Sequence, residues 1–299
     1  MTPLAARTRK GATDGSLGRR RPDQPTWTQR GHRSIPKVEV PRLAEVAPDI
    51  CSNQKPLGMI IISRPLVAFV GFVAMAINGW WAATPLVVWF FYGSNLSAMH
   101  HLMHGSLGMT AKWRHRWLSV LGCLVGESGH ALQATHTVHH RDGTDLPDPE
   151  GYIEYLTWAQ MPLGALQYRY RMMWWGWTFG ARRARISAEI AVHVASVTFA
   201  VAAVPFTRIP LAYLALVQAS AFAFAILQGK GPQANWGREM PTPLLLLSTR
   251  LLAVLFFSHH QHLEHHAYPK VPLPRLGELR PVVEAAVADA EVIELDLWV

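Results

Sequence analysis

Histidines in three short stretches are the residues of this sequence whose type and spacing could support chemistry. The stretches are residues 100–104, 136–140 and 262–266. Together with His259 and His260, just before the third stretch, they hold eleven of the fifteen histidines in the chain. Neutral imidazole is the commonest side-chain metal ligand. Metal binding is therefore the first hypothesis that the sequence raises.

The spacing within each stretch suits a helix that aims several rings at one point, because residues i, i+3 and i+4 share a helix face. His100 and His104 are four residues apart, and the other two stretches each repeat the i, i+3, i+4 pattern. The predicted metal ligands are His100, His104, His136, His139, His140, His262, His265 and His266. Eight imidazoles exceed the four ligands of a zinc site. They fit two metal ions, and imidazole is a suitable ligand for iron.

The composition favours a membrane protein. The chain has 299 residues, of which 50% are hydrophobic, and it contains 12 tryptophans. Its two cysteines, Cys51 and Cys123, are too few for a disulfide framework or a zinc ribbon. The net charge of +8 is concentrated in the N-terminal region and in loops beside apolar segments. Such basic flanks are typical of membrane orientation, and we predict no nucleic-acid partner.

Three regions follow from the distribution of apolar residues. Residues 1–56 are rich in Arg, Gly and Pro and show no apolar periodicity, which predicts a disordered basic cytosolic tail. A nucleic-acid-binding arm is the less favoured reading of this stretch. Residues 57–285 are predicted to form a membrane domain, and residues 286–299 a C-terminal tail.

Four apolar stretches in the membrane domain are close to the length of about 20 residues that a transmembrane helix needs. They run from Pro65 to Trp81, Leu86 to His104, Ile186 to Phe206 and Ile209 to Gln228. A further stretch, Leu244 to Phe257, is short and contains Arg250. Because an arginine at mid-bilayer is costly, we expect that stretch to be an interfacial helix.

The long loop between the second and third spans indicates which side of the membrane holds the histidines. Residues 105–187 carry nine Lys or Arg residues, which predicts a cytosolic location. Two hairpins then place all three histidine stretches on the same side. The predicted fold is an all-α, multi-pass membrane protein with four transmembrane helices in two hairpins and a cytosolic helical cap that carries the histidine boxes.

These motifs resemble the membrane-bound fatty acid desaturase and hydroxylase superfamily. The first stretch is similar to its His-x-x-x-His box, and the second and third match His-x-x-His-His. The third continues as His265-His266-Ala267-Tyr268-Pro269-x-x-Pro272, similar to the His-His-x-x-Pro tail of the family. Asp148-Pro149-Glu150 resembles an acidic segment found in several branches. The resemblance covers roughly residues 60 to 280.

The resemblance implies a membrane oxidoreductase with two iron ions and dioxygen as co-substrate. The expected reaction is desaturation of a fatty acyl chain, and the expected substrate is a lipid acyl or another long apolar chain. Carotenoid ketolation or hydroxylation and acyl hydroxylation are the alternatives. The sequence has neither a cysteine cluster for an iron–sulfur centre nor a Gly-x-Gly-x-x-Gly fingerprint. An external ferredoxin-type electron carrier with its reductase is therefore expected.

The chain departs from the family pattern at two points. His101 stands where the first box often has Asp or Glu, and no histidine lies between His193 and His259 to supply the ninth ligand of many members. The candidates for an additional ligand or for orienting a ligand are His101, His259, His260, Asn235 and Asp148.

The remaining histidines and one other class of protein complete the sequence-based predictions. His130 and His193 are predicted to be structural, and His32 and His115 to be solvated. A histidine-rich membrane metal transporter is a distant alternative, but such a protein places its ligands near mid-bilayer. Here the first box lies at the end of a predicted span, and the other two lie outside the spans.

Overall fold

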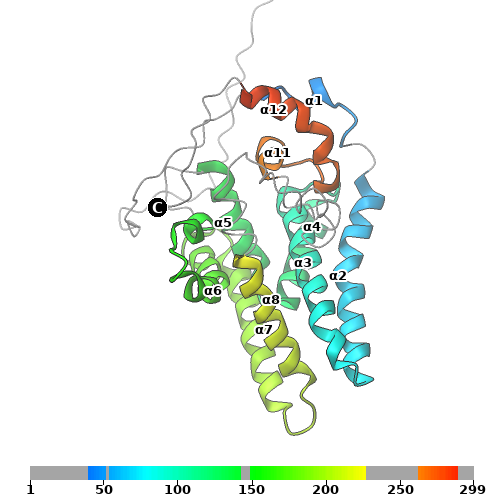
Figure 1. Ribbon diagram of the computed structural model, residues 1–299, viewed down its shortest axis with the longest axis vertical. Coiled ribbons are helices and arrows are strands. Elements are labelled where there is room, and N and C mark those ends of the chain that lie inside the picture. Colours follow the sequence, from blue (N-terminus) through cyan, green and yellow to red (C-terminus); the bar gives the residue numbers. More distant parts are fainter. Residues whose placement is uncertain (1–39, 52–53, 143–148, 227–261, 289–299) are drawn as a thin grey trace, which may run out of the picture.

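A computed structural model describes residues 40–51, 54–142, 149–226 and 262–288, and all regular elements in these ranges are helices. The predicted all-α class is confirmed for this part of the chain. Two long helical hairpins extend in the same direction, and short helices from both ends of the described chain lie beyond their opposite ends (Figure 1). The histidine stretches lie where the hairpins meet this group of short helices.

The first hairpin consists of α2 (Gln54–Ile77) and α3 (Thr84–His104), with the short 3-10 helix η1 (Trp81–Ala83) at its turn. Its apolar core includes Phe72 and Phe91, which are almost completely buried. The first predicted span began at Pro65, but α2 starts eleven residues earlier and contains Pro65 within it. An internal proline removes one backbone hydrogen bond, and packing against α3 keeps the helix continuous.

The second hairpin consists of α7 (Arg183–Ala202) and α8 (Ile209–Phe224), close to the third and fourth predicted spans. Tyr213 of α8 joins this hairpin to the first. Its ring centroid lies 5.3 Å from that of Phe72 and 5.8 Å from that of Phe91. Its hydroxyl donates a hydrogen bond of 2.6 Å to the carbonyl of Leu124. The two hairpins therefore share one interior.

Two of the described helices, α2 and α7, are long and apolar enough to cross a membrane, and α8 is a shorter apolar helix. In the most apolar 18-residue stretch of each helix, only 33% is buried inside the protein in α2 and 22% in α7. Val70 on α2 and Phe199 on α7 are 65% and 64% exposed. The core helix of a soluble protein would bury such side chains, whereas a lipid environment would solvate them. In the described residues, length and composition support two of the four predicted spans.

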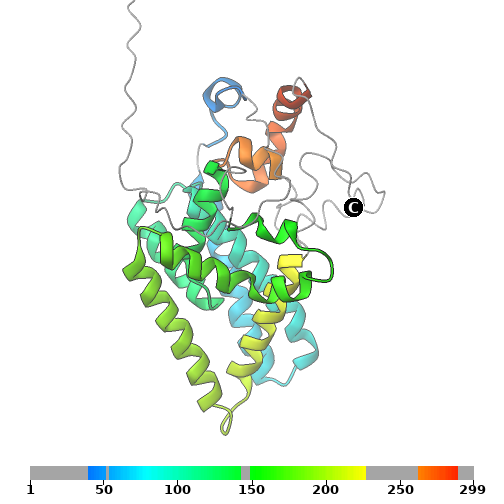
Figure 2. The ribbon, with the colours of Figure 1, turned by 90° about the vertical axis from the view of Figure 1, so that its left-hand side faces the viewer.

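Three further helices pack against the hairpins: α4 (Ala111–Leu124), α5 (Gly129–Asp142) and α6 (Met161–Phe179), with the 3-10 helix η2 (Gly151–Tyr155) before α6. Figure 2 shows α6 crossing the hairpin directions. Glycines let these helices approach closely. A Cβ on Gly129 would lie 2.2 Å from the carbonyl oxygen of Leu118, and one on Gly176 would lie 2.5 Å from Cα of Ala131. This packing fixes α5, which carries the second histidine box.

A separate apolar cluster holds the third histidine box in place. It joins α11 (His262–Ala267), η4 (Leu273–Leu279) and α12 (Arg280–Ala288) to the N-terminal helix α1 (Leu43–Val46). Ile50 and Leu276 are buried in this cluster, and the Tyr268 hydroxyl donates to the carbonyl of Pro41 at 2.8 Å. Residues 40–51, which their composition assigns to the tail, thus form part of the folded cap.

Several sequence-based predictions lie outside the described residues. They concern residues 1–39 and 289–299 of the two tails and the interfacial helix expected from Leu244 to Phe257. The predicted boundaries of the membrane domain, 57–285, stay a prediction.

Candidate metal centre

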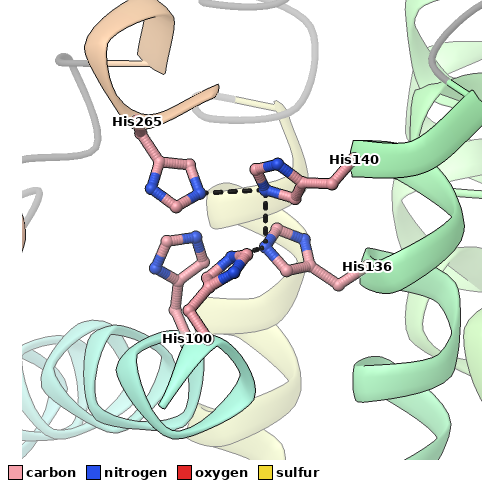
Figure 3. A group of neighbouring side chains, drawn as sticks. His100, His136, His140 and His265 are labelled. Atoms are coloured by element: carbon pink, nitrogen blue, oxygen red, sulfur yellow. Dashed lines mark hydrogen bonds between the residues drawn. The ribbon is translucent and has the colours of Figure 1, made fainter. Parts of the chain in front are cut away.

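The three histidine boxes meet at one point. His100 and His104 come from the last turn of α3, His136 and His140 from α5, and His265 from α11. One ring nitrogen from each of these five residues lies within 4.8 Å of all the others. Figure 3 shows the labelled rings pointing toward one another from three separate helices. The predicted convergence of the boxes is therefore a property of the structure.

The distances between ring nitrogens test whether this group fits a metal ion. Nε2 of His136 lies 2.7 Å from Nε2 of His104 and 3.1 Å from Nε2 of His140. Nε2 of His265 lies 2.9 Å from that of His140. Nitrogens that ligate one ion at about 2.1 Å are themselves roughly 3 Å apart in an octahedral arrangement. The spacing and the purely imidazole donor set thus fit a transition-metal site.

His139 and His266 lie beside these five rings. The ring of His266 stacks on that of His140, with centroids 4.2 Å apart, and lies 4.9 Å from that of His139. His139 and His266 therefore border the five-histidine group on the side of α5 and α11. The side chain of His262, the eighth predicted ligand, lies outside the described residues, as do His259, His260, Asn235 and Asp148.

The end of α3 places the first box at the centre of the site. The helix ends at Gly105, whose φ of 70° lies in the left-handed region that favours glycine. A Cβ at this position would lie 2.6 Å from Nη1 of Arg114. Glycine thus lets the chain turn sharply after His104 and lets α4 return beneath it.

His101 takes a different role from its neighbours in the first box. Its side chain is buried, and its Nδ1 lies 2.8 Å from the hydroxyl of Ser106 in the turn after α3. It does not belong to the five-histidine group. Of the two roles open to it from the sequence, the geometry favours a contact that supports the box over direct ligation.

Glu150 holds one of the central rings. Its Oε2 lies 2.9 Å from Nδ1 of His136, and Thr135 donates to its Oε1 at 3.2 Å. A carboxylate on the outer nitrogen of a ligating histidine fixes the ring and its tautomer. Asp148 was the residue of this segment predicted to orient a ligand. The signal for Glu150 was in the same acidic segment, two residues further on.

Glu264 lies within the third box, directly before His265, and contacts α12. It is buried, and its Oε1 accepts a 2.8 Å hydrogen bond from Nε of Arg280 on α12. The sequence analysis did not single out either residue. An acidic residue in the middle of a histidine box was the signal that could have indicated a positioning contact.

The environment of His136 keeps its ring neutral. Burial, followed by the charges that His104 and the other box histidines would carry, lowers the pKa of His136 well below its ordinary value. A neutral ring with a free lone pair is the form that binds a metal. At neutral pH His136 is therefore in the form that can bind a metal ion.

Among the described residues, the histidines outside the boxes, His115, His130 and His193, do not join this group. His130 pairs with Glu189 at 2.6 Å, and His193 is buried on α7, in line with the structural roles predicted for them. His115 differs from its predicted solvated state, since it is half-buried against His130 and Arg182. Residue spacing in the sequence could not predict this contact, because the contact joins residues on α4, α5 and the start of α7.

Comparisons with known proteins agree with the resemblance seen in the motifs. A family model described as "Fatty acid desaturase" matches residues 78–297, well over half of the chain. The match includes all three histidine boxes. Neither a curated protein nor a solved structure gives a significant match.

Proposed function

The chain belongs to the fatty acid desaturase family, and from that premise we propose that it carries out an oxygen-dependent desaturation of a fatty acyl chain. The observation that carries the proposal is the group of five imidazoles, drawn from three boxes on three helices, with nitrogens within 4.8 Å of one another. A structural metal site does not need so many converging ligands. The arrangement suits a catalytic iron centre.

The box histidines would hold two iron ions. His100, His104, His136, His140 and His265 supply the converging nitrogens, and His139 and His266 lie beside them on α5 and α11. When bound, iron would supply the activation of dioxygen and the removal of hydrogen from an unactivated C–H bond. Glu150 and Glu264 orient the second and third boxes through His136 and Arg280.

We also propose that the protein crosses the membrane four times, with α3 and α8 in addition to α2 and α7. The support is that each apolar helix is paired in a hairpin, and that both hairpins extend away from the histidine boxes (Figure 1). The boxes would then face the cytosol, because the basic residues of 105–187 lie at the same end. An acyl chain could reach the iron from the bilayer.

Electrons would come from a separate ferredoxin-type carrier and its reductase. The support is the family membership together with the sequence, which carries neither an iron–sulfur motif nor a dinucleotide fingerprint. The carrier would dock at the cytosolic end, where the boxes lie.

Reconstitution tests this function directly. Purified protein loaded with iron is mixed with ferredoxin, its reductase, reduced nicotinamide and candidate acyl thioesters or acyl lipids, under air and under nitrogen. A product lighter by two hydrogens, formed only in air and only with the carrier, is the expected result. The His104→Ala variant serves as the inactive control. A product heavier by one oxygen would assign acyl hydroxylation instead.

Two alternatives give different results in related assays. Turnover of carotenes without turnover of any acyl chain would assign carotenoid ketolation or hydroxylation. A metal transporter would move iron into sealed vesicles without a carrier or oxygen. The site favours the enzyme, because the first box lies at the end of α3 and not at its middle, where a transport site would be expected.

A further inference from the structure

We propose that Arg114, Arg182 and Arg185 bind the phosphate of an anionic phospholipid, at a site separate from the histidine boxes. Arg114 lies in the first turn of α4, and Arg182 and Arg185 lie at the start of α7. The inference rests on the proposed insertion of α7 in a membrane. It does not depend on the reaction or on the metal.

Positive charge is crowded where these helices meet. Nη1 of Arg182 lies 2.7 Å and 2.6 Å from the two ring nitrogens of His115. That ring stacks on His130 at 5.2 Å, and Nη1 of Arg185 lies 3.5 Å from Nε2 of His130. Burial and then Arg182 lower the pKa of His115 to about 4, so His115 is neutral at physiological pH. The charge of the cluster therefore comes from its guanidinium groups.

The one carboxylate that joins this cluster, Glu189, offsets only part of that charge. Glu189 accepts hydrogen bonds from the hydroxyls of Ser119 and Ser128 at 2.5 Å and 2.6 Å, and its Oε1 lies 2.6 Å from Nδ1 of His130. Among the described residues, no Asp or Glu forms an ion pair with Arg114, Arg182 or Arg185. Three guanidinium groups thus share the region with one carboxylate that is engaged elsewhere.

One unused, buried hydrogen-bond donor points to an absent acceptor. Within the described residues, Nε of Arg114 is buried and has no hydrogen-bond partner. Arg183, at the same end of α7, differs because its Nη2 donates to the carbonyl of Thr178. Guanidinium groups bind phosphate oxygens through paired N–H donors. The N-terminal end of a helix also favours a negatively charged group such as phosphate. A phosphate would satisfy the donors and offset the repulsion.

The position of the cluster favours a lipid over a soluble anion. Arg182 and Arg185 lie at the start of α7, the point at which an apolar helix would leave the bilayer. Trp113 on α4 and Trp177 on α6 are about half exposed nearby, and Trp177 donates a 3.0 Å hydrogen bond to Ser187 of α7. Tryptophan prefers the membrane interface. Basic pockets between helices at this depth bind anionic headgroups.

Ligand-dependent thermal stability in detergent tests the site. The wild type, Arg182→Gln/Arg185→Gln and Arg208→Gln are each titrated with short-chain phosphatidylglycerol, short-chain phosphatidylcholine and inorganic phosphate. Arg208 is the matched control, since it is exposed at the other end of the same hairpin. Phosphatidylglycerol should raise the Tm of the wild type and the control. The double variant should need roughly tenfold more of it for the same shift.

Each other outcome overturns the proposal. An unchanged phosphatidylglycerol response in the double variant would show that these arginines do not bind the headgroup. An equal response to phosphatidylcholine would exclude recognition of net negative charge. An equal response to inorganic phosphate would assign a soluble ligand to the site.

If the double variant does not fold, Arg185→Lys replaces it and should give a smaller loss in the same direction.

The iron content of each variant separates this inference from the proposed function. We expect the arginine variants to bind as much iron as the wild type, because the arginines contact no box histidine through a hydrogen bond among the described residues. A protein that binds no iron but responds to phosphatidylglycerol would refute the function and keep the lipid site.

Discussion

Oε2 of Glu150 lies 2.9 Å from Nδ1 of His136, and the opposite nitrogen of the same ring faces His104 and His140. One carboxylate from the segment before α6 thus sets the direction of a ring at the centre of the three boxes. Because His136 is buried, its orientation depends on this contact more than it would at the surface.

We predict that Glu150→Ala lowers iron affinity by about 10- to 100-fold, the range seen when such an outer contact of a ligating histidine is removed. Glu150→Gln should lose less, because its amide oxygen can still accept a hydrogen bond. Iron retained per chain during titration with a chelator is the measurement. Glu278→Gln, which alters an exposed pair with Arg275, is the control. Equal iron retention in Glu150→Ala and wild type would remove this role from Glu150.

A second prediction concerns the ligands themselves. Separate changes of His104, His139 and His265 to alanine should each abolish turnover and reduce bound iron below the two ions expected for the wild type, since each removes an imidazole from a different box. Metal analysis and membrane fractionation of the same samples are the measurements. His32→Ala, outside the boxes, should behave as wild type. Full activity in any of the three box variants would contradict the di-iron assignment.

The sequence could predict which histidines meet but not what supports them. Helical spacing places His136 and His140 on one face, and that local relation survives in α5. The contacts of Glu150 with His136 and of Arg280 with Glu264 join segments 14 and 16 residues apart in the chain. No periodicity encodes such pairs. They depend on how α5, α11 and α12 pack.

The fold, like the site, could be predicted from the sequence only in part. Hydrophobic runs predicted the two hairpins, but the first predicted span began at Pro65, whereas α2 begins at Gln54 and continues through that proline. The role of residues 40–51 was also missed, because a composition rich in charged and small residues hides isolated anchors such as Ile50. A short segment can be ordered by a few buried side chains that have no period.

Close helix packing leads to a third prediction. Gly176→Ala should destabilise the protein by about 1–3 kcal/mol, because the new methyl group would lie 2.5 Å from Cα of Ala131 and push α6 away from α5. Gly71→Ala is the matched control, since its nearest new contact would be an ordinary 3.9 Å to Val87. Thermal unfolding of both variants is the measurement. A Gly176→Ala protein as stable as Gly71→Ala would show that the α5–α6 contact can relax.

The fourth prediction concerns topology. After replacement of Cys51 and Cys123, single cysteines at Ala82 and Thr207 should react with an impermeant reagent from the non-cytosolic side, because both positions are exposed at the turns of the hairpins. A cysteine at Gln160 should react only from the cytosolic side. Labelling of Gln160 from the same side as Thr207 would contradict the proposed four-span arrangement.

The last prediction concerns the third box, which depends on a pair of opposite charges. Glu264 is 5% exposed and lies next to His265, and Nε of Arg280 donates to it at 2.8 Å. A second pair, Arg275 with Glu278, lies on the surface of η4 at a similar distance of 2.9 Å. The two pairs allow the effect of burial to be separated from the effect of charge.

Arg280→Gln should weaken iron binding and speed hydrogen exchange in α11, because it leaves the Glu264 carboxylate buried without its cation. Removing one member of a fully buried pair costs about 3–5 kcal/mol, and we expect about 2 kcal/mol here because Arg280 is 32% exposed. Arg275→Gln should change little, since exposed pairs contribute about 0–1 kcal/mol. Adding Glu264→Gln to Arg280→Gln should recover part of the loss, because the uncompensated charge is then removed. Equal effects of the two arginine changes, or no recovery in the double variant, would show that the third box is held by apolar packing alone.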